Sequence, residues 1–216
     1  MRALHLTLDR LIRWAAPDGI LRRTRVFLAL VLAYGVFAAT YLPINLFSRG
    51  RPARTLYLPG EASIPFVPAF EFLYVLGYLL PVLAVFALPG PRELRRLLVA
   101  FGMTLLVAYG TYLLFPVWFE RPALQPDSLA TWLLWLEYHD PSYNHFPSLH
   151  VGISWLLYLA CRRGVRFPRL FLVTVLGIAL STLLVKQHYM MDVLYGIGLA
   201  SLTWAATALL DRKLAA

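Results

Sequence analysis

A histidine and an aspartate four residues apart are the side chains best suited to chemistry in this chain. His188 and Asp192 lie where one apolar run ends and another begins. Residues four apart share one face of a helix, so the Asp192 carboxylate can accept a hydrogen bond from one imidazole nitrogen and fix its tautomer. The other nitrogen is then free to attack an electrophile. The alternative is a purely structural hydrogen bond.

A second candidate is Phe146-Pro147-Ser148-Leu149-His150, which comes directly before an apolar run. Proline and serine are favoured where a helix begins. The free N–H groups and positive dipole end of such a helix would bind a phosphate, with Ser148 and His150 in the first turn. The alternative is that Ser148 serves only as a helix cap.

The third candidate is Arg121, which lies in the long polar segment before Phe146. A guanidinium can hold two phosphate oxygens through parallel hydrogen bonds. Taken alone, Arg121 is better explained as a solvated loop charge or an anchor for lipid headgroups.

A zinc site is a further alternative, with His150, His188 and Asp192 as the ligands. The chain has no His-Glu-x-x-His or similar close pair, which argues against it. We therefore expect neither a metal nor another cofactor. His139 and His145 lie in the same polar segment, and we assign them no role.

These candidate residues belong to a very apolar chain. Its 216 residues are 60% hydrophobic and have a mean hydropathy of +0.66, whereas soluble domains are about 45 to 50% apolar. The single cysteine, Cys161, excludes an internal disulfide. We expect one all-α transmembrane domain over residues 1–216, with the lipid bilayer as its surroundings.

Six apolar stretches predict a polytopic protein with six transmembrane helices, because a bilayer core requires about 20 apolar residues per helix. The fourth stretch is short, so we expect its outer end not to contact lipid. In residues 2–15, apolar and charged side chains recur with helical spacing, which predicts an amphipathic helix. This helix would lie within an interfacial segment, residues 1–25, on the cytoplasmic side. The six stretches are residues 26–46, 66–88, 97–116, 149–161, 169–186 and 190–210.

The positive charges predict the orientation of these helices. The net charge of +9 comes mainly from arginines at the amino end, in the second-to-third and fourth-to-fifth loops, and in the tail. The positive-inside rule then places both termini in the cytoplasm and the candidate residues, within 115–192, at the extracytoplasmic face. This asymmetry explains the basic composition without a nucleic-acid partner. We expect an integral protein of a bacterial inner or plasma membrane, and the oligomeric state is left open.

These motifs resemble the type 2 phosphatidate phosphatase superfamily of membrane enzymes. That family carries Lys-x6-Arg-Pro, then Pro-Ser-Gly-His, then Ser-Arg-x5-His-x3-Asp. The second motif is matched by residues 147–150, and the third by Ser181-Thr182, five residues, His188, three residues and Asp192. The order, the spacing of the third motif and the six stretches agree with the family over roughly residues 60–205.

The departures from the family pattern concern its phosphate-binding cations. Arg121-Pro122 matches the end of the first motif, but Leu114 stands at its lysine position, and Thr182 replaces the arginine of the third. Leu149 replaces the glycine of the second motif. These features look more like the branch of inositol phosphorylceramide synthases, and sphingomyelin synthases are similar around His188. Lys186 could replace part of the missing charge.

The resemblance implies a lipid phosphatase or phosphotransferase that acts through a phosphohistidine and needs no metal. His188 would be the nucleophile, Asp192 would orient it, and His150 would be the acid and base. The phosphate oxygens would be bound by Arg121, Ser148, Ser181 and Lys186. A membrane lipid phosphate or an intact phospholipid would be the substrate, and headgroup transfer is the alternative to hydrolysis. A non-enzymatic flippase or transporter is the second alternative, although its polar residues would be expected at mid-membrane depth.

Overall fold

The computed structural model describes residues 2–141 and 143–215, and its elements are helical apart from isolated backbone bridges. Apolar stretches form helices because a helix pairs its own backbone groups where water is absent. The helices are α1 Arg2–Ala15, α2 Arg23–Ser48, η1 Glu61–Ser63, η2 Pro68–Phe70, α3 Glu71–Ala87, α4 Pro91–Leu114, α5 Leu129–Glu137, α6 Leu149–Cys161, α7 Pro168–Leu184 and α8 Met190–Ala215.

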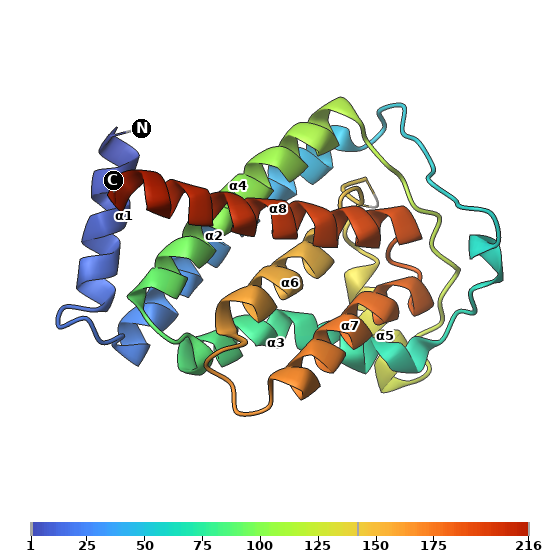
Figure 1. The fold of residues 1–216 in the computed structure, drawn as a ribbon. Helices are drawn as coiled ribbons and strands as arrows, with labels where there is room; N and C mark the ends of the chain where they lie inside the picture. The colour runs from blue at the N-terminus through green and yellow to red at the C-terminus, as the bar shows by residue number, and fades with distance from the viewer. Residues whose placement is uncertain (1, 142, 216) are drawn as a thin grey trace.

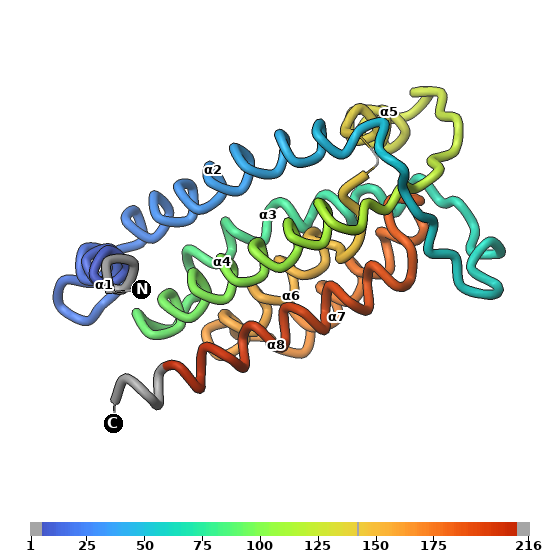
Figure 2. The backbone as a smooth tube through the Cα atoms, turned by 90° about the horizontal axis from the view of Figure 1, so that it is seen from above, coloured from blue at the N-terminus to red at the C-terminus, as the bar shows by residue number. Residues whose placement is uncertain are grey.

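Helix α6 is the centre of the bundle and contacts α3, α4, α7 and α8. Its residues Leu156 and Ala160 are almost completely buried, within the largest hydrophobic core. Helix α2 packs on the outside against α3 and α4 (Figure 2). It exposes large apolar side chains such as Phe27 and Leu32. Apolar residues on the outer surface are what contact with lipid requires.

The two ends of the bundle differ in character. Helix α1 and the last turns of α8 lie at one end, and α5 with the long connecting segments lies at the other (Figures 1 and 2). Isolated bridges join Arg54 to Val117 and Val117 to Asn144, so three of these connecting segments are held together. Helices α6 and α8 both begin at this end. The candidate residues are therefore gathered at one end of the molecule.

The prediction of spanning helices is confirmed in part. Among the described residues, four helices are long and apolar enough to cross a membrane: Arg23–Ser48, Pro68–Ala87, Pro91–Leu114 and Met190–Leu210. The apolar helices α6 and α7 are shorter. With 13 residues, α6 is about 20 Å long, against about 30 Å for a bilayer core. Six spans therefore remain a prediction, as does the interfacial position of α1.

Two elements differ from the sequence-based expectation. Helix α5 was not expected, and it begins with a capping box in which Ser128 and Thr131 satisfy each other's backbone N–H groups. Helix α4 begins at Pro91 rather than near residue 97. Its first turns contain arginines that lower the local hydropathy, but proline at the first helical position favours a helix start.

A close crossing of α6 and α8 brings two of the candidate motifs together. A Cβ added to Gly152 would lie 3.2 Å from the Gly196 carbonyl oxygen, and one added to Gly196 would lie 2.6 Å from the Ser148 carbonyl oxygen. Only glycine allows the two backbones to approach this closely. The Ser148 N–H donates to the Asp192 carbonyl at 3.0 Å, so the starts of α6 and α8 are hydrogen-bonded.

Candidate active site

His188 and Asp192 are paired at the start of α8. The His188 Nδ1 atom lies 3.2 Å from Asp192 Oδ2, and both side chains are buried. The same Oδ2 accepts the Tyr189 N–H at 2.9 Å, which caps the first turn of α8. Because Nδ1 is used by the carboxylate, Nε2 is the nitrogen that remains for a substrate.

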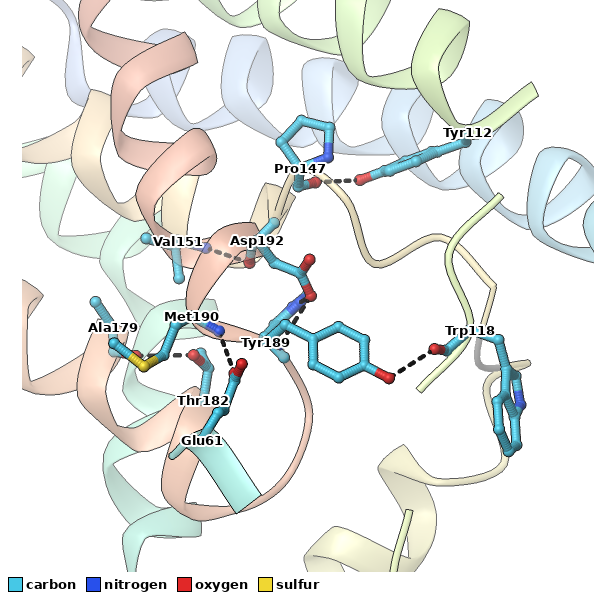
Figure 3. A network of polar contacts seen from close by, with 12 residues as sticks. Glu61, Tyr112, Trp118, Pro147, Val151, Ala179, Thr182, Tyr189, Met190 and Asp192 are labelled. Carbon is cyan, nitrogen blue, oxygen red and sulfur yellow. Dashed lines mark hydrogen bonds and ion pairs between the residues drawn. The ribbon is translucent and has the colours of Figure 1, made fainter. Parts of the chain in front are cut away.

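Neighbouring segments hold the start of α8 in place (Figure 3). Glu61 accepts the Met190 N–H through one carboxylate oxygen and the Leu58 N–H through the other. The Tyr189 hydroxyl donates to the Trp118 carbonyl at 3.0 Å. Carboxylates at a helix N-terminus also interact favourably with the helix dipole. The position of the His188 ring therefore depends on the segments that follow α2 and α4.

Ser148 is the N-cap of α6. Its side chain accepts the Val151 N–H at 3.3 Å. The preceding carbonyl, of Pro147, accepts the Tyr112 hydroxyl at 2.8 Å, so α4 supports the turn into α6. The sequence-based expectation of a helix that begins here is confirmed, since α6 begins at Leu149.

His150 lies against α3. Its Nε2 atom is 3.1 Å from the Tyr74 carbonyl oxygen, and its ring stacks on the Tyr74 ring with centroids 4.0 Å apart. A carbonyl oxygen only accepts, so Nε2 carries the hydrogen. Gly77 leaves the space for the ring, because a Cβ there would overlap with Nε2.

Arg121 is held by the main chain after α5. One guanidinium nitrogen donates to the carbonyls of Tyr138 at 3.2 Å and Asp140 at 2.7 Å. Its Nε–H is buried and has no acceptor among the described residues. A buried N–H without a partner is costly, so Arg121 keeps a donor available for an anionic ligand.

A cavity of about 370 Å³ reaches Arg121, His150 and His188, whereas neither Ser148 nor Asp192 is among its lining residues. Its polar end is lined by Arg121, His145, His150 and His188, and the remainder is mostly apolar. The cavity also reaches the outside of α2 at Tyr34, which is 57% exposed. Its apolar lining comes from three helices. It includes Leu30, Phe37 and Leu42 of α2, Leu97, Leu98 and Phe101 of α4, and Leu156 and Leu157 of α6. The shape suits a molecule with a polar head and an apolar tail.

His145 is a site residue that was not expected from the sequence. Its ring is buried, lines the cavity, and lies 5.3 Å from the His188 ring between centroids. No helical spacing links it to His188; the two meet because the segment with Asn144 is bridged to Val117. A resemblance centred on the three motifs gave no reason to single out residue 145.

Burial changes the proton affinity of several groups at this end. Burial, with His188 and Arg121 nearby, holds the pKa of His145 well below its ordinary value. The ring is therefore neutral at pH 7. Burial raises the pKa of Glu137 and of Asp140, which both line the cavity, although hydrogen bonds from Tyr78 and Tyr41 act in the opposite direction.

Two expected phosphate-binding residues point elsewhere. The Ser181 hydroxyl is buried and donates to the Ile178 carbonyl at 2.7 Å. The Lys186 ammonium donates to the Ile64 carbonyl, and neither residue lines the cavity. At the family's other cationic positions, Leu114 is 86% exposed and the buried Thr182 donates to Ala179. Arg121 is thus the only lysine or arginine that lines the cavity in the described part of the chain.

The residues that could hold a metal differ from those considered in the sequence analysis. His145, His188 and Asp192 each offer a ligand atom, and these atoms lie within 4.8 Å of one another. The third possible ligand, beside His188 and Asp192, is therefore His145 and not His150 as considered from the sequence. Two imidazoles and a carboxylate are a ligand set that zinc accepts.

Comparison with known proteins identifies the family. The model of a family described as the PAP2 superfamily matches residues 57–206. No curated protein sequence gives a significant match. The matched region includes His150, His188 and Asp192, and it covers more than half of the sequence. The chain belongs to the PAP2 superfamily.

Proposed function

We propose that this integral membrane protein cleaves a phosphoester of a lipid through a phosphohistidine on His188. The observation that carries the proposal is His188, which lines the polar end of a largely apolar cavity and is held from behind by Asp192. Such a cavity places the phosphorus of an amphiphile beside a nucleophile while its tail remains among apolar side chains. Membership of the PAP2 superfamily supports phosphatase or phosphotransferase chemistry.

In the first half of the reaction, the Nε2 lone pair of His188 attacks phosphorus and the bond to the leaving oxygen breaks. Asp192 holds Nδ1 and stabilises the positive ring. His150, protonated on both ring nitrogens for this step, gives the leaving oxygen the proton on Nε2 once that oxygen replaces the Tyr74 carbonyl as its partner, and the ring becomes neutral. Arg121 and the N–H groups at the start of α6, beside Ser148, stabilise the phosphoryl oxygens.

In the second half, an acceptor hydroxyl attacks phosphorus, His150 takes its proton, and the N–P bond breaks. Water as the acceptor gives hydrolysis, whereas a lipid hydroxyl gives transfer. His188 supplies the nucleophile, Asp192 orients it, and His150 serves as acid and then base, so the scheme uses no metal or other cofactor. Ser181 and Lys186 would have to leave their carbonyl partners to reach the phosphate.

We propose that the active site lies at the extracytoplasmic face, and the arginine distribution along the sequence supports this orientation. In that orientation both termini are cytoplasmic. This agrees with the position of α1 and the end of α8 at the end of the bundle opposite the site.

The test is a set of assays on purified protein in detergent with excess chelator. Phosphatidate, polyprenyl diphosphate and phosphatidylglycerol phosphate serve as substrates, and phosphate release is measured. The wild type and His139→Ala, which changes an exposed loop histidine, should both be active, and His188→Ala should be inactive. Activity that survives His188→Ala, or that requires a metal, would contradict the proposal. Headgroup binding without turnover would instead favour the transporter alternative.

The charges that line the cavity favour headgroup transfer as a second candidate function. Arg121 shares the lining with Glu137 and Asp140. A phosphomonoester carries two negative charges, which the single positive charge of Arg121 balances poorly beside these carboxyl groups. A phosphodiester carries only one negative charge and is balanced better. Incubation with phosphatidylinositol and an acceptor lipid separates the two functions. A new phospholipid in this incubation would indicate a transferase of the inositol phosphorylceramide or sphingomyelin synthase type. Free phosphate released from phosphatidate in a parallel incubation would indicate a hydrolase.

A further inference from the structure

The geometry points to a regulatory site for a zinc-like divalent cation, formed by His145, His188 and Asp192, that blocks the nucleophile when it is occupied. The three side chains are 4%, 9% and 0% exposed. Their ligand atoms already lie within 4.8 Å of one another. The effect on activity rests on the proposed function, but binding of the metal does not.

The ligand atoms are close to the geometry that zinc requires. With Zn–N and Zn–O distances near 2.0 to 2.2 Å, tetrahedral donors are about 3.4 Å apart. The three ligand atoms now lie up to 4.8 Å apart. Side-chain movements on the order of 1 Å would therefore bring them to the separation that zinc requires. Rotations of these side chains can supply that movement.

A second observation comes from Asp192. Its Oδ1 atom is buried and has no hydrogen-bond partner among the described residues. The other oxygen, Oδ2, is already shared by the Tyr189 N–H and His188. A buried carboxylate oxygen without a donor is costly, and a cation would satisfy it.

The surroundings of His145 also suit a ligand. Its ring makes a hydrogen bond with the main chain of Gln187, and metal-binding histidines are usually oriented by such a second contact. Two imidazoles favour Zn²⁺ or Co²⁺ over Mg²⁺, which prefers oxygen ligands.

Occupancy of this site would stop the proposed reaction. A metal bound to Nδ1 of His188, the nitrogen that faces Asp192, takes the place of their hydrogen bond. The ring hydrogen then lies on Nε2, so Nε2 has no free lone pair to attack phosphorus and no N–P bond can form. Zinc should therefore inhibit, and a chelator should restore activity.

The test begins with full-length protein in detergent, stripped of metal and then titrated with Co²⁺. Wild type and His139→Ala should bind one equivalent, with the intense visible absorption of tetrahedral Co²⁺. His145→Ala and His145→Asn should bind more than about 100-fold more weakly, beyond the 10- to 100-fold typical of residues that only support a ligand. Unchanged binding by folded His145 variants, or no binding by the wild type, overturns the site.

Folding and activity provide two further readouts. Zinc should raise the melting temperature of the wild type and His139→Ala but not of the His145 variants, whose metal-free melting curves report whether they are folded. Each variant's activity with zinc is compared with its own activity in chelator. Phosphate release that is unaffected by zinc overturns the regulatory site and leaves the proposed function standing. Activity that appears only with metal overturns both.

Discussion

At the scale of residues, the site depends on how each imidazole is held. His188 is fixed by Asp192, and His150 is fixed by the Tyr74 carbonyl and ring. His145 is fixed by neither motif and is nevertheless in ring contact with His188. The pairing of residues 188 and 192 could be predicted from their separation, but not its form: His188 precedes α8, and Asp192 reaches back from the first turn of the helix. The contact with His145 could not, because it arises from a tertiary bridge between loops.

Gly77→Ala tests whether the position of His150 matters. The added methyl group would overlap with the end of the His150 ring, so the ring must move while the backbone of α3 stays in place. A displacement near 1 Å in an active site lowers the rate by about 100-fold. We expect such a loss of turnover with little change in melting temperature. Gly102→Ala, where a Cβ meets nothing within 4 Å, is the control, and equal activity of the two variants would contradict this role.

The stability of the protein should respond to the low pKa of His145. Burial beside His188 and Arg121 disfavours the charged form of the His145 ring in the folded protein. In the unfolded chain the same ring takes up a proton at about pH 6.5. The stabilisation is therefore present above that pH and is lost as the pH falls. The melting temperature of the wild type should fall more steeply on acidification than that of His145→Asn. His139→Asn should follow the wild type, and parallel curves for all three proteins would refute the expectation.

At the scale of elements, short helices and a glycine crossing create the site. Helix α6 was predicted at residues 149–161 and lies there, because its cap and its apolar run are local signals. The close approach of α6 to α8 at Gly152 and Gly196 is not local. Glycines occur throughout the chain, and the sequence alone does not show which of them allow two backbones to meet.

Gly196→Ala tests this crossing. Its Cβ would lie 2.6 Å from the Ser148 carbonyl oxygen, which belongs to the backbone and cannot rotate away. The helices must separate, and overpacking of this kind typically costs about 1 to 3 kcal/mol. Thermal unfolding and turnover should both fall. Gly198→Ala lies on the same helix with no atom within 4 Å, so it should behave like the wild type, and a harmless Gly196→Ala would disprove the role of the crossing.

At the scale of the whole molecule, one end carries the chemistry and the other carries α1 and the end of α8. This separation could be predicted because arginine clusters and apolar runs alternate along the chain. Helix α5 and the path of the loops could not, since their polar sequences contain no period that relates them to the bundle.

Labelling of single cysteines tests the predicted orientation. In a Cys161→Ala background, Gln125→Cys lies in an exposed loop at the site end and Arg163→Cys in an exposed loop at the other. A membrane-impermeant maleimide added to intact cells should label the first and should label the second only after lysis. The reverse pattern would place the active site at the cytoplasmic face.

The central claim is the covalent intermediate on His188. Wild-type protein mixed with a lipid substrate labelled in its phosphorus, then quenched within milliseconds, should carry label that is stable to alkali and labile to acid. Peptide mapping should place it on His188, and His188→Ala should carry none. Turnover without any labelled protein, or equal labelling of His188→Ala, would contradict the account.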